Sequence, residues 1–179
     1  YRRYNKMGIP SYYKNTIQNY PEIIIPDNKF LEHIDYLLLD LNCAIHPCCS
    51  GKTVVNEMYT SVFEKIQECI SLTKVKKLVY IAIDGPAPRT KMEQQRQRRL
   101  KSSQEHKIWD TNQITPGTDF MNNLSIYLNQ ECKKLSVDYI ISDSNERGEG
   151  EHKIMKYIST LSNNTISVVY GLDADLIML

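Results

Sequence analysis

The sequence predicts an α/β fold in which helices cover both faces of a mainly parallel sheet. Short, almost continuously apolar segments of strand length recur along the chain, and helix-forming segments separate them. Strands that lack polar alternation are typical of parallel sheets buried on both faces. The chain has 179 residues, of which 41% are hydrophobic and 24% charged, so it suits one globular domain rather than a disordered chain.

The first half of the chain is expected to supply two of the strands. Residues 11–20 favour a short helix, and the apolar run at 36–41 predicts the first buried strand. At 56–73 apolar side chains recur three and four positions apart, which is the spacing of one helix face. The run at 77–83 predicts a second buried strand, and the basic segment 88–107 has the composition of a helix.

The second half is expected to supply two more strands in the same alternation. A proline opens the helix expected over 116–134, because proline is favoured in the first helical turn. Buried strands follow at 137–142 and 166–170, with a helix over 149–161 between them. The chain stops within the apolar stretch 177–179, which leads us to expect the front part of a longer protein.

The charge balance and the cysteines disfavour several classes of protein. There are 22 basic and 21 acidic residues, giving a net charge of +1, and no apolar run approaches the ~18 residues of a membrane span. No apolar region follows the charged N-terminus, so we expect no secretory signal. The five cysteines form no C-x-x-C pair, which disfavours a disulfide framework or a zinc site. We therefore expect an intracellular protein, in the cytoplasm or, as a second choice, in the nucleus.

Carboxylates stand at or shortly after the end of all four expected strands. In an open parallel sheet the carboxyl ends of the strands lie on one edge, which is where such sheets bind ligands. Taken singly, each of these acids has a more ordinary interpretation as a turn or helix-cap residue. Together they predict a single cleft that contains Asp40, Asp84, Glu149, Glu151, Asp173 and Asp175.

Such a cluster is costly unless cations neutralise it, because like charges and burial both oppose ionisation. Mg²⁺, or alternatively Mn²⁺, prefers oxygen ligands, and two such ions promote phosphodiester hydrolysis. Glu149 and Glu151 stand two positions apart, as do Asp173 and Asp175, so the paired side chains share one side only on extended backbone. Each pair is therefore expected in a loop or at the start of a helix.

The segment 89–107 is locally basic, with seven Lys or Arg residues and two Glu in a nearly neutral chain. One face of the expected helix would present Lys91, Gln95, Arg98 and Arg99, whose donors suit a single phosphate group. The alternative is an ordinary solvated charged face. His46, expected in the loop after the first strand, is either a surface or packed side chain or an imidazole that stacks on a nucleobase.

Six strings of the sequence resemble, in the same order, those of a known nuclease family. They are MGIP at 7–10, LLLDLNCAIH at 37–46, IAIDGPAPRTKMEQQRQRRL at 81–100, ITPGTDFM at 114–121, GEGEHKIM at 148–155 and YGLDADLIML at 170–179. On these strings the chain is similar to the N-terminal nuclease domain of the XRN family of 5′-3′ exoribonucleases. The resemblance implies a PIN-like/FEN-like nuclease fold. It also implies Mg²⁺-dependent, processive removal of nucleotides from single-stranded RNA with a 5′-monophosphate.

The resemblance further implies roles for particular residues. The six acids at the strand ends match the metal-binding residues of the family, and Lys91, Gln95, Arg98 and Arg99 match its pocket for the 5′-phosphate. His46 matches the histidine that stacks on the first bases, and Asn42 lies at the same strand end of the active site. Residues 7–179 would be the N-terminal part of such a domain, incomplete at its C-terminus, and residues 1–6 a leader or a cloning remnant.

Two other functions stay open at this level. A structure-specific DNA nuclease of the wider FEN/PIN group would share the carboxylate cluster, although Gln95 and the ITPGT string favour the exoribonuclease. A catalytically silent fragment that binds RNA or acts as a scaffold would keep the basic face without hydrolysis. Metal-dependent cleavage of single-stranded RNA would separate the three.

Overall fold

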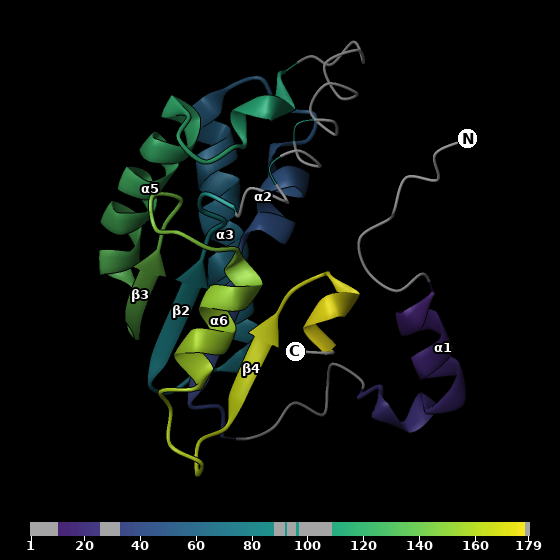
Figure 1. Ribbon diagram of the computed structural model, residues 1–179. Coiled ribbons are helices and arrows are strands. Elements are labelled where there is room, and N and C mark those ends of the chain that lie inside the picture. Colours follow the sequence, from purple (N-terminus) through teal and green to yellow (C-terminus); the bar gives the residue numbers. More distant parts are fainter. Residues whose placement is uncertain (1–10, 26–32, 88–91, 93–95, 97–108, 178–179) are drawn as a thin grey trace, which may run out of the picture.

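The chain forms a four-stranded sheet with helices around it, in the predicted element order apart from one additional α-helix after the first strand (Figure 1). The computed structural model describes residues 11–25, 33–87, 92, 96 and 109–177, and every structural statement below refers to these residues. The strands are β1 (Tyr36–Asp40), β2 (Leu78–Ala82), β3 (Asp138–Ser142) and β4 (Ser167–Tyr170). The α-helices are α1 (Tyr12–Asn19), α2 (Asn42–Cys49), α3 (Val55–Thr73), α5 (Asp119–Glu131) and α6 (Gly150–Ile158). Short 3₁₀ helices are η1 (Pro21–Ile23), η3 (Thr111–Gln113), η4 (Cys132–Lys134) and η5 (Ala174–Ile177).

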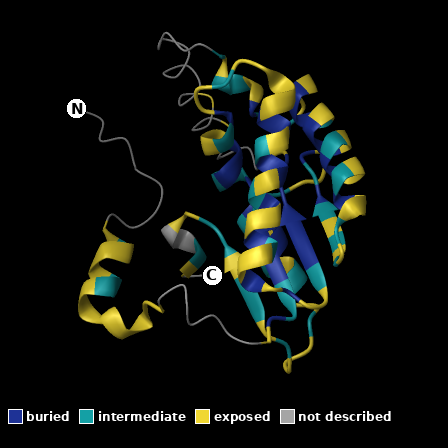
Figure 2. Cartoon of the chain, turned by 180° about the vertical axis from the view of Figure 1, so that it is seen from behind, coloured by how far each residue is buried: buried dark blue, intermediate teal, exposed yellow. Residues whose placement is uncertain are grey.

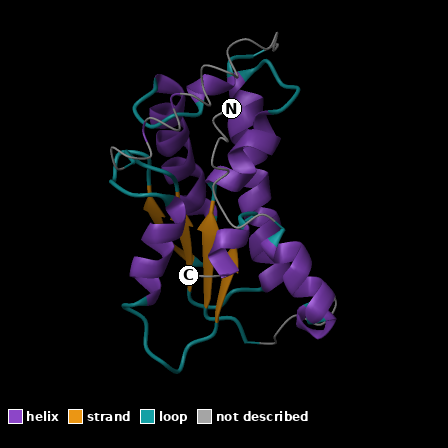
Figure 3. Ribbon diagram, turned by 45° about the vertical axis from the view of Figure 1, so that its right-hand side comes forward, coloured by secondary structure: helices purple, strands orange, loops and turns teal. Residues whose placement is uncertain are grey.

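All four strands are parallel, as predicted, and lie in the order β3-β2-β1-β4. β1 pairs with β2 up to Asp40 opposite Ala82, and with β4 up to Leu39 opposite Tyr170. The strands therefore point to the same end of the molecule (Figure 3). The direction in which strands are added reverses between β1 and β4, and open parallel sheets bind ligands at such a point.

The two faces of the sheet are covered by different helices, which confirms the predicted layering. Leu37 and Leu39 of β1 belong to the main core, which the sheet forms with α2, α3 and α5. Leu38, between them, packs on the opposite face with Tyr80 and with Ile154 of α6. Figure 2 shows the buried interior between sheet and helices and the exposed outer sides of the helices. Strand side chains buried on both faces explain why the strands read as continuous apolar runs.

The expected helices α3 and α5 follow from their apolar spacing and from local capping. α3 buries Met58, Val62 and Ile66 on one face, as predicted. α5 begins later than the expected position 116, because the hydroxyl of Thr118 accepts the backbone N–H of Met121 and caps the helix there. Its buried face packs into the same core as α3.

The structure differs from the expectations at α2, a helix that the sequence did not predict. Pro47 lies inside it, and an internal proline removes a backbone donor, so this segment looked like a loop. The prediction of a helix over 88–107 falls mostly outside the described residues. Met92 and Arg96, the two that are described, are helical.

The N-terminal helix α1 buries none of its residues and lies apart from the sheet in Figures 1 and 2. Its residue range, Tyr12–Asn19, confirms the short helix expected over 11–20. Among the residues that the structure describes, no helix is long and apolar enough to cross a membrane.

Candidate active site

The predicted acids reach the carboxyl edge of the sheet from four different strands. Asp40 is the last residue of β1, and Asp84 follows β2 by two positions. Glu149 and Glu151 stand at the start of α6, after β3, and Asp173 follows β4. Because the strands are parallel, all these positions lie on one edge.

Asp40 is the centre of this group of carboxylates. Burial raises the pKa of Asp40 to about 7, and nearby negative charges add to the effect. These charges belong to Asp84, Glu151 and Asp173. The backbone N–H of Asn42 acts in the opposite direction but does not compensate. The tertiary structure has therefore gathered acids that crowd one another, as the strand topology led us to expect.

The buried oxygen of Asp40 fits a cation ligand. Its Oδ1 atom is enclosed and has no hydrogen-bond partner. A buried carboxylate oxygen without a partner is unfavourable, and a bound cation would both pair with it and relieve the repulsion between the acids. The donors around it are carboxylates, the ligand type that Mg²⁺ and Mn²⁺ prefer. The residues present thus fit the predicted metal.

Asp84 is held from two sides by backbone contacts. The side-chain oxygen of Asn42 accepts the backbone N–H of Asp84 at 2.9 Å. The backbone N–H of Gly150, the first residue of α6, donates to Oδ1 of Asp84 at 2.7 Å. A Cβ on Gly150 would lie only 2.5 Å from Oδ1 of Asp40, so no larger residue fits there without displacing that carboxylate. The start of α6 therefore touches both acids.

Glu149 and Glu151 stand at a helix start, as their spacing predicted. Glu149 is the extended residue before α6, only 8% exposed, and its side chain does not cap the helix. Carboxylate oxygens of both acids and a ring nitrogen of His152 lie within 4.8 Å of one another. Nδ1 of His152 is 3.6 Å from Oε1 of Glu151. The sequence reasoning gave His152 no role, and its place directly after the acid pair is the only signal that could have found it.

His46 and Asn42 both lie on α2, one helical turn apart. The prediction that His46 lies in a loop is therefore wrong, because Pro47 made this helix look like a loop in the sequence. His46 is exposed, whereas Asn42 is half-buried and uses its side-chain oxygen to hold the backbone of Asp84. The spacing of four positions puts both on one side of the helix, and Asn42 turns its side chain toward the backbone of Asp84.

Several predicted site residues cannot be placed by their side chains. Asp175 belongs to η5, but its side chain is outside the described part of the chain. The proposed phosphate-binding residues Lys91, Gln95, Arg98 and Arg99 also lie outside the described residues. Their roles stay predictions from the sequence.

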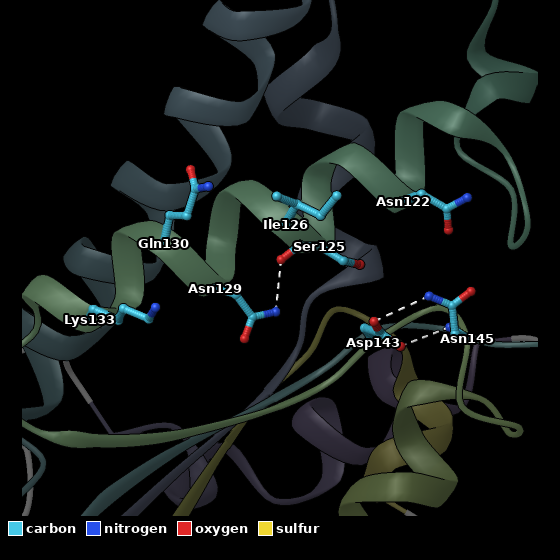
Figure 4. Close-up of a pocket in the computed structure, with 8 residues that line it drawn as sticks. All are labelled: Asn122, Ser125, Ile126, Asn129, Gln130, Lys133, Asp143 and Asn145. Atoms are coloured by element: carbon cyan, nitrogen blue, oxygen red, sulfur yellow. Dashed lines mark hydrogen bonds between the residues drawn. The ribbon is translucent and has the colours of Figure 1, made fainter.

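A separate groove of 390 Å³ lies between α5 and the turn after β3 (Figure 4). Asn122, Asn129 and Lys133 line it from the helix, and Asp143 and Asn145 line it from the turn. None of the predicted site residues that the structure describes lines this groove. Its turn does, however, begin the loop that leads to Glu149, so its geometry bears on the site.

Comparison with known proteins identifies the family. The sequence model described as "XRN 5′-3′ exonuclease N-terminus" matches residues 7–108 and 102–179, which together span almost the whole chain. The chain belongs to this family. The parallel sheet with acids at its carboxyl edge is accordingly an α/β fold of the PIN-like nuclease kind, as the resemblance implied.

Relatives of the chain within the XRN family carry a common name. Proteins named "5′-3′ exoribonuclease 2" are 34% identical in Cryptococcus neoformans and in Arabidopsis thaliana, each over 97% of this chain. The protein of that name in Schizosaccharomyces pombe is 37% identical over 89% of the chain. These matches cover 22%, 24% and 21% of the relatives, so the chain spans between a fifth and a quarter of their length.

Proposed function

We propose that this chain is the nuclease part of a 5′-3′ exoribonuclease that hydrolyses single-stranded RNA with a 5′-monophosphate, using two Mg²⁺ ions. The observation that carries the proposal is the meeting of acids from four strand ends around Asp40, whose buried Oδ1 has no hydrogen-bond partner. Membership of the XRN family, and the names of its relatives, support both the reaction and RNA as the substrate. Mn²⁺ is the alternative cation.

The chain contributes to hydrolysis by holding carboxylate oxygens in fixed positions. When bound, Mg²⁺ ions would stabilise the charge that develops on the phosphate and lower the pKa of water at the site. Asn42 and the N–H of Gly150 fix Asp84, and the missing side chain of Gly150 lets α6 approach Asp40. The residues proposed to hold the ions are Asp40, Asp84, Glu149, Glu151, Asp173 and Asp175.

We assign recognition of the 5′-phosphate of the RNA to the basic segment after Asp84. Lys91, Gln95, Arg98 and Arg99 recur at helical spacing, and arginine offers forked donors that match phosphate oxygens. In the sequence the segment comes shortly after Asp84, which lies at the carboxyl edge of the sheet. A pocket that fits one phosphate would accept a 5′-monophosphate and disfavour a 5′-triphosphate or a cap.

We assign to His46 the stacking contact with the first bases of the RNA. His46 is exposed on α2, one turn after Asn42, whose side chain holds the backbone of Asp84, and α2 itself is anchored in the core. Aromatic rings stack on unpaired bases with little preference for sequence. This contact would favour single strands over duplexes.

The proposal is tested with the full-length protein on single-stranded RNAs that differ only in the 5′-end. We expect Mg²⁺-dependent release of nucleotides from 5′-monophosphate RNA, much slower degradation of 5′-triphosphate RNA, and no cleavage in EDTA. Asp84→Asn should abolish cleavage and keep RNA binding, because it removes charge from the acids only. Arg98→Ala should reduce the preference for the 5′-monophosphate, whereas the neighbouring exposed Arg96→Ala serves as the matched control.

Three outcomes would contradict the proposal in different ways. Equal rates on both RNA ends would remove the phosphate pocket. Faster cleavage of DNA flaps than of RNA would favour a structure-specific DNA nuclease. RNA binding without any metal-dependent hydrolysis would favour a silent RNA-binding or scaffold protein.

A further inference from the structure

The proposed site rests on a buried cationic side chain that belongs to the chain itself. Lys153 of α6 is only 6% exposed, although lysine is rarely buried. Its ammonium group donates to the backbone carbonyl oxygen of Ile83 and to that of Asp143, each at 2.7 Å. A buried ammonium group is costly unless it is hydrogen-bonded, and these two contacts meet that requirement.

The two carbonyls lie where the pairing of β2 and β3 ends. Ala82 and Ser142 are the last paired residues of the two strands, and the N–H of Ile83 still donates to the carbonyl of Ser142. Just beyond this point, the ammonium group of Lys153 hydrogen-bonds to both the segment that follows β2 and the segment that follows β3. The side chain of Lys153 therefore links the two segments one residue beyond the last backbone hydrogen bond between the strands.

The two segments that Lys153 joins carry acids of the site. Ile83 directly precedes Asp84, whose next residue, Gly85, donates its N–H to the carbonyl of Gly148 at 2.8 Å. Asp84 is thus fixed on both sides along its backbone. The other segment starts at Asp143 and runs to Glu149, the residue before α6.

The turn at Asp143 is also fixed from its outer side, within the groove of Figure 4. Its carboxylate accepts the backbone N–H of Asn145 at 2.9 Å and the side-chain amide of Asn145 at 3.3 Å. Lys153 holds the same residue from the inside through its carbonyl. The loop that delivers Glu149 therefore has its first residue held on both sides.

We infer that Lys153 is a positioning residue of the nuclease site, whose buried ammonium group locks the ends of β2 and β3 so that Asp84 and Glu149 face the same cations. The inference rests on the proposed function, because it assigns those acids to metal binding. Lys153 touches neither RNA nor cation in this role; it acts through the backbone that carries the acids. Groups that orient metal ligands typically change metal affinity or activity by about 10–100-fold when they are removed.

The test uses the full-length protein and Lys153→Met, which keeps the length of the side chain but loses the donors. Lys156→Met, an exposed lysine on the same helix, is the matched control. Mn²⁺ binding is measured by calorimetry without RNA, and kcat and KM are measured on 5′-monophosphate RNA. We expect Lys153→Met to weaken Mn²⁺ binding and to lower kcat by about tenfold or more, with KM within twofold of the wild type. Lys156→Met should match the wild type in all three.

A folded Lys153→Met protein with wild-type Mn²⁺ affinity and kcat overturns the inference. The inference is also overturned if the loss of Mn²⁺ binding and of kcat equals the fraction of unfolded protein measured by circular dichroism, because a merely structural role of Lys153 predicts such a loss. If Lys153→Met does not fold, Lys153→Gln is measured in the same way, and unchanged Mn²⁺ affinity in that folded variant overturns the inference as well. A wild type that neither binds Mn²⁺ nor degrades RNA would instead refute the proposed function.

Discussion

Replacement of Gly150 by alanine should separate activity from stability in this protein. Gly150 begins α6, donates its N–H to Asp84 and lies against the buried oxygen of Asp40. Its φ is not in the left-handed region, so alanine can adopt its backbone conformation. The only obstacle is space, since the new Cβ would lie 2.5 Å from Oδ1 of Asp40 and 3.5 Å from Oδ1 of Asp84.

The size of the effect follows from these distances. A Cβ atom essentially never lies closer than 3.0 Å to a heavy atom to which it is not bonded, so the Asp40 carboxylate must move by at least about 0.5 Å. A misplacement of ~1 Å at a reacting centre can cost about 100-fold in rate, so we expect kcat to fall by about 10–100-fold. Alanine is favoured over glycine in helices by up to ~1 kcal/mol, which offsets the strain, so stability should change by less than about 1 kcal/mol.

The assay pairs Mg²⁺-dependent degradation of 5′-monophosphate RNA with urea unfolding. Gly51→Ala is the control, because a Cβ there meets nothing within 4 Å but Gly51 has a φ of 73°. It should cost about 1 kcal/mol of stability and leave kcat unchanged, the reverse of Gly150→Ala. Wild-type kcat in Gly150→Ala would refute the reasoning, as would a loss explained by unfolded protein alone.

Two further predictions concern pH and the core. Because burial raises the pKa of Asp40 from 3.8 to about 7, the folded metal-free protein retains a proton that the unfolded chain has lost. Its free energy of unfolding should fall as the pH rises from about 4 to about 7, and Asp40→Asn should remove that part of the fall in thermal melts with EDTA. On α5, Leu124→Ala should cost about 2–5 kcal/mol in urea unfolding, because Leu124 is 0% exposed. Ile126→Ala, at a residue 58% exposed, should change stability by no more than about 0.5 kcal/mol.

Much of the fold could be predicted because burial leaves a local pattern in the sequence. The run at 37–39 is apolar throughout, because Leu37 and Leu38 face different helices and neither face meets water. Acids at strand ends could be assigned to one edge, because parallel strands allow no other arrangement. The α-helix α2, which was missed, contains a proline that weakens the same kind of local signal.

The sequence by itself therefore determined the order of the strands and of the described α-helices other than α2, and it placed the acids at one edge of the sheet. The tertiary structure alone decided the contacts that make the grouping a site. The order β3-β2-β1-β4 sets which acids surround Asp40, and the approach of α6 leaves no room for a side chain at Gly150. Lys153 looks like any helix lysine in the sequence, and it is buried only because two strands happen to end beside it. Such contacts join residues far apart in the chain, so no local pattern encodes them.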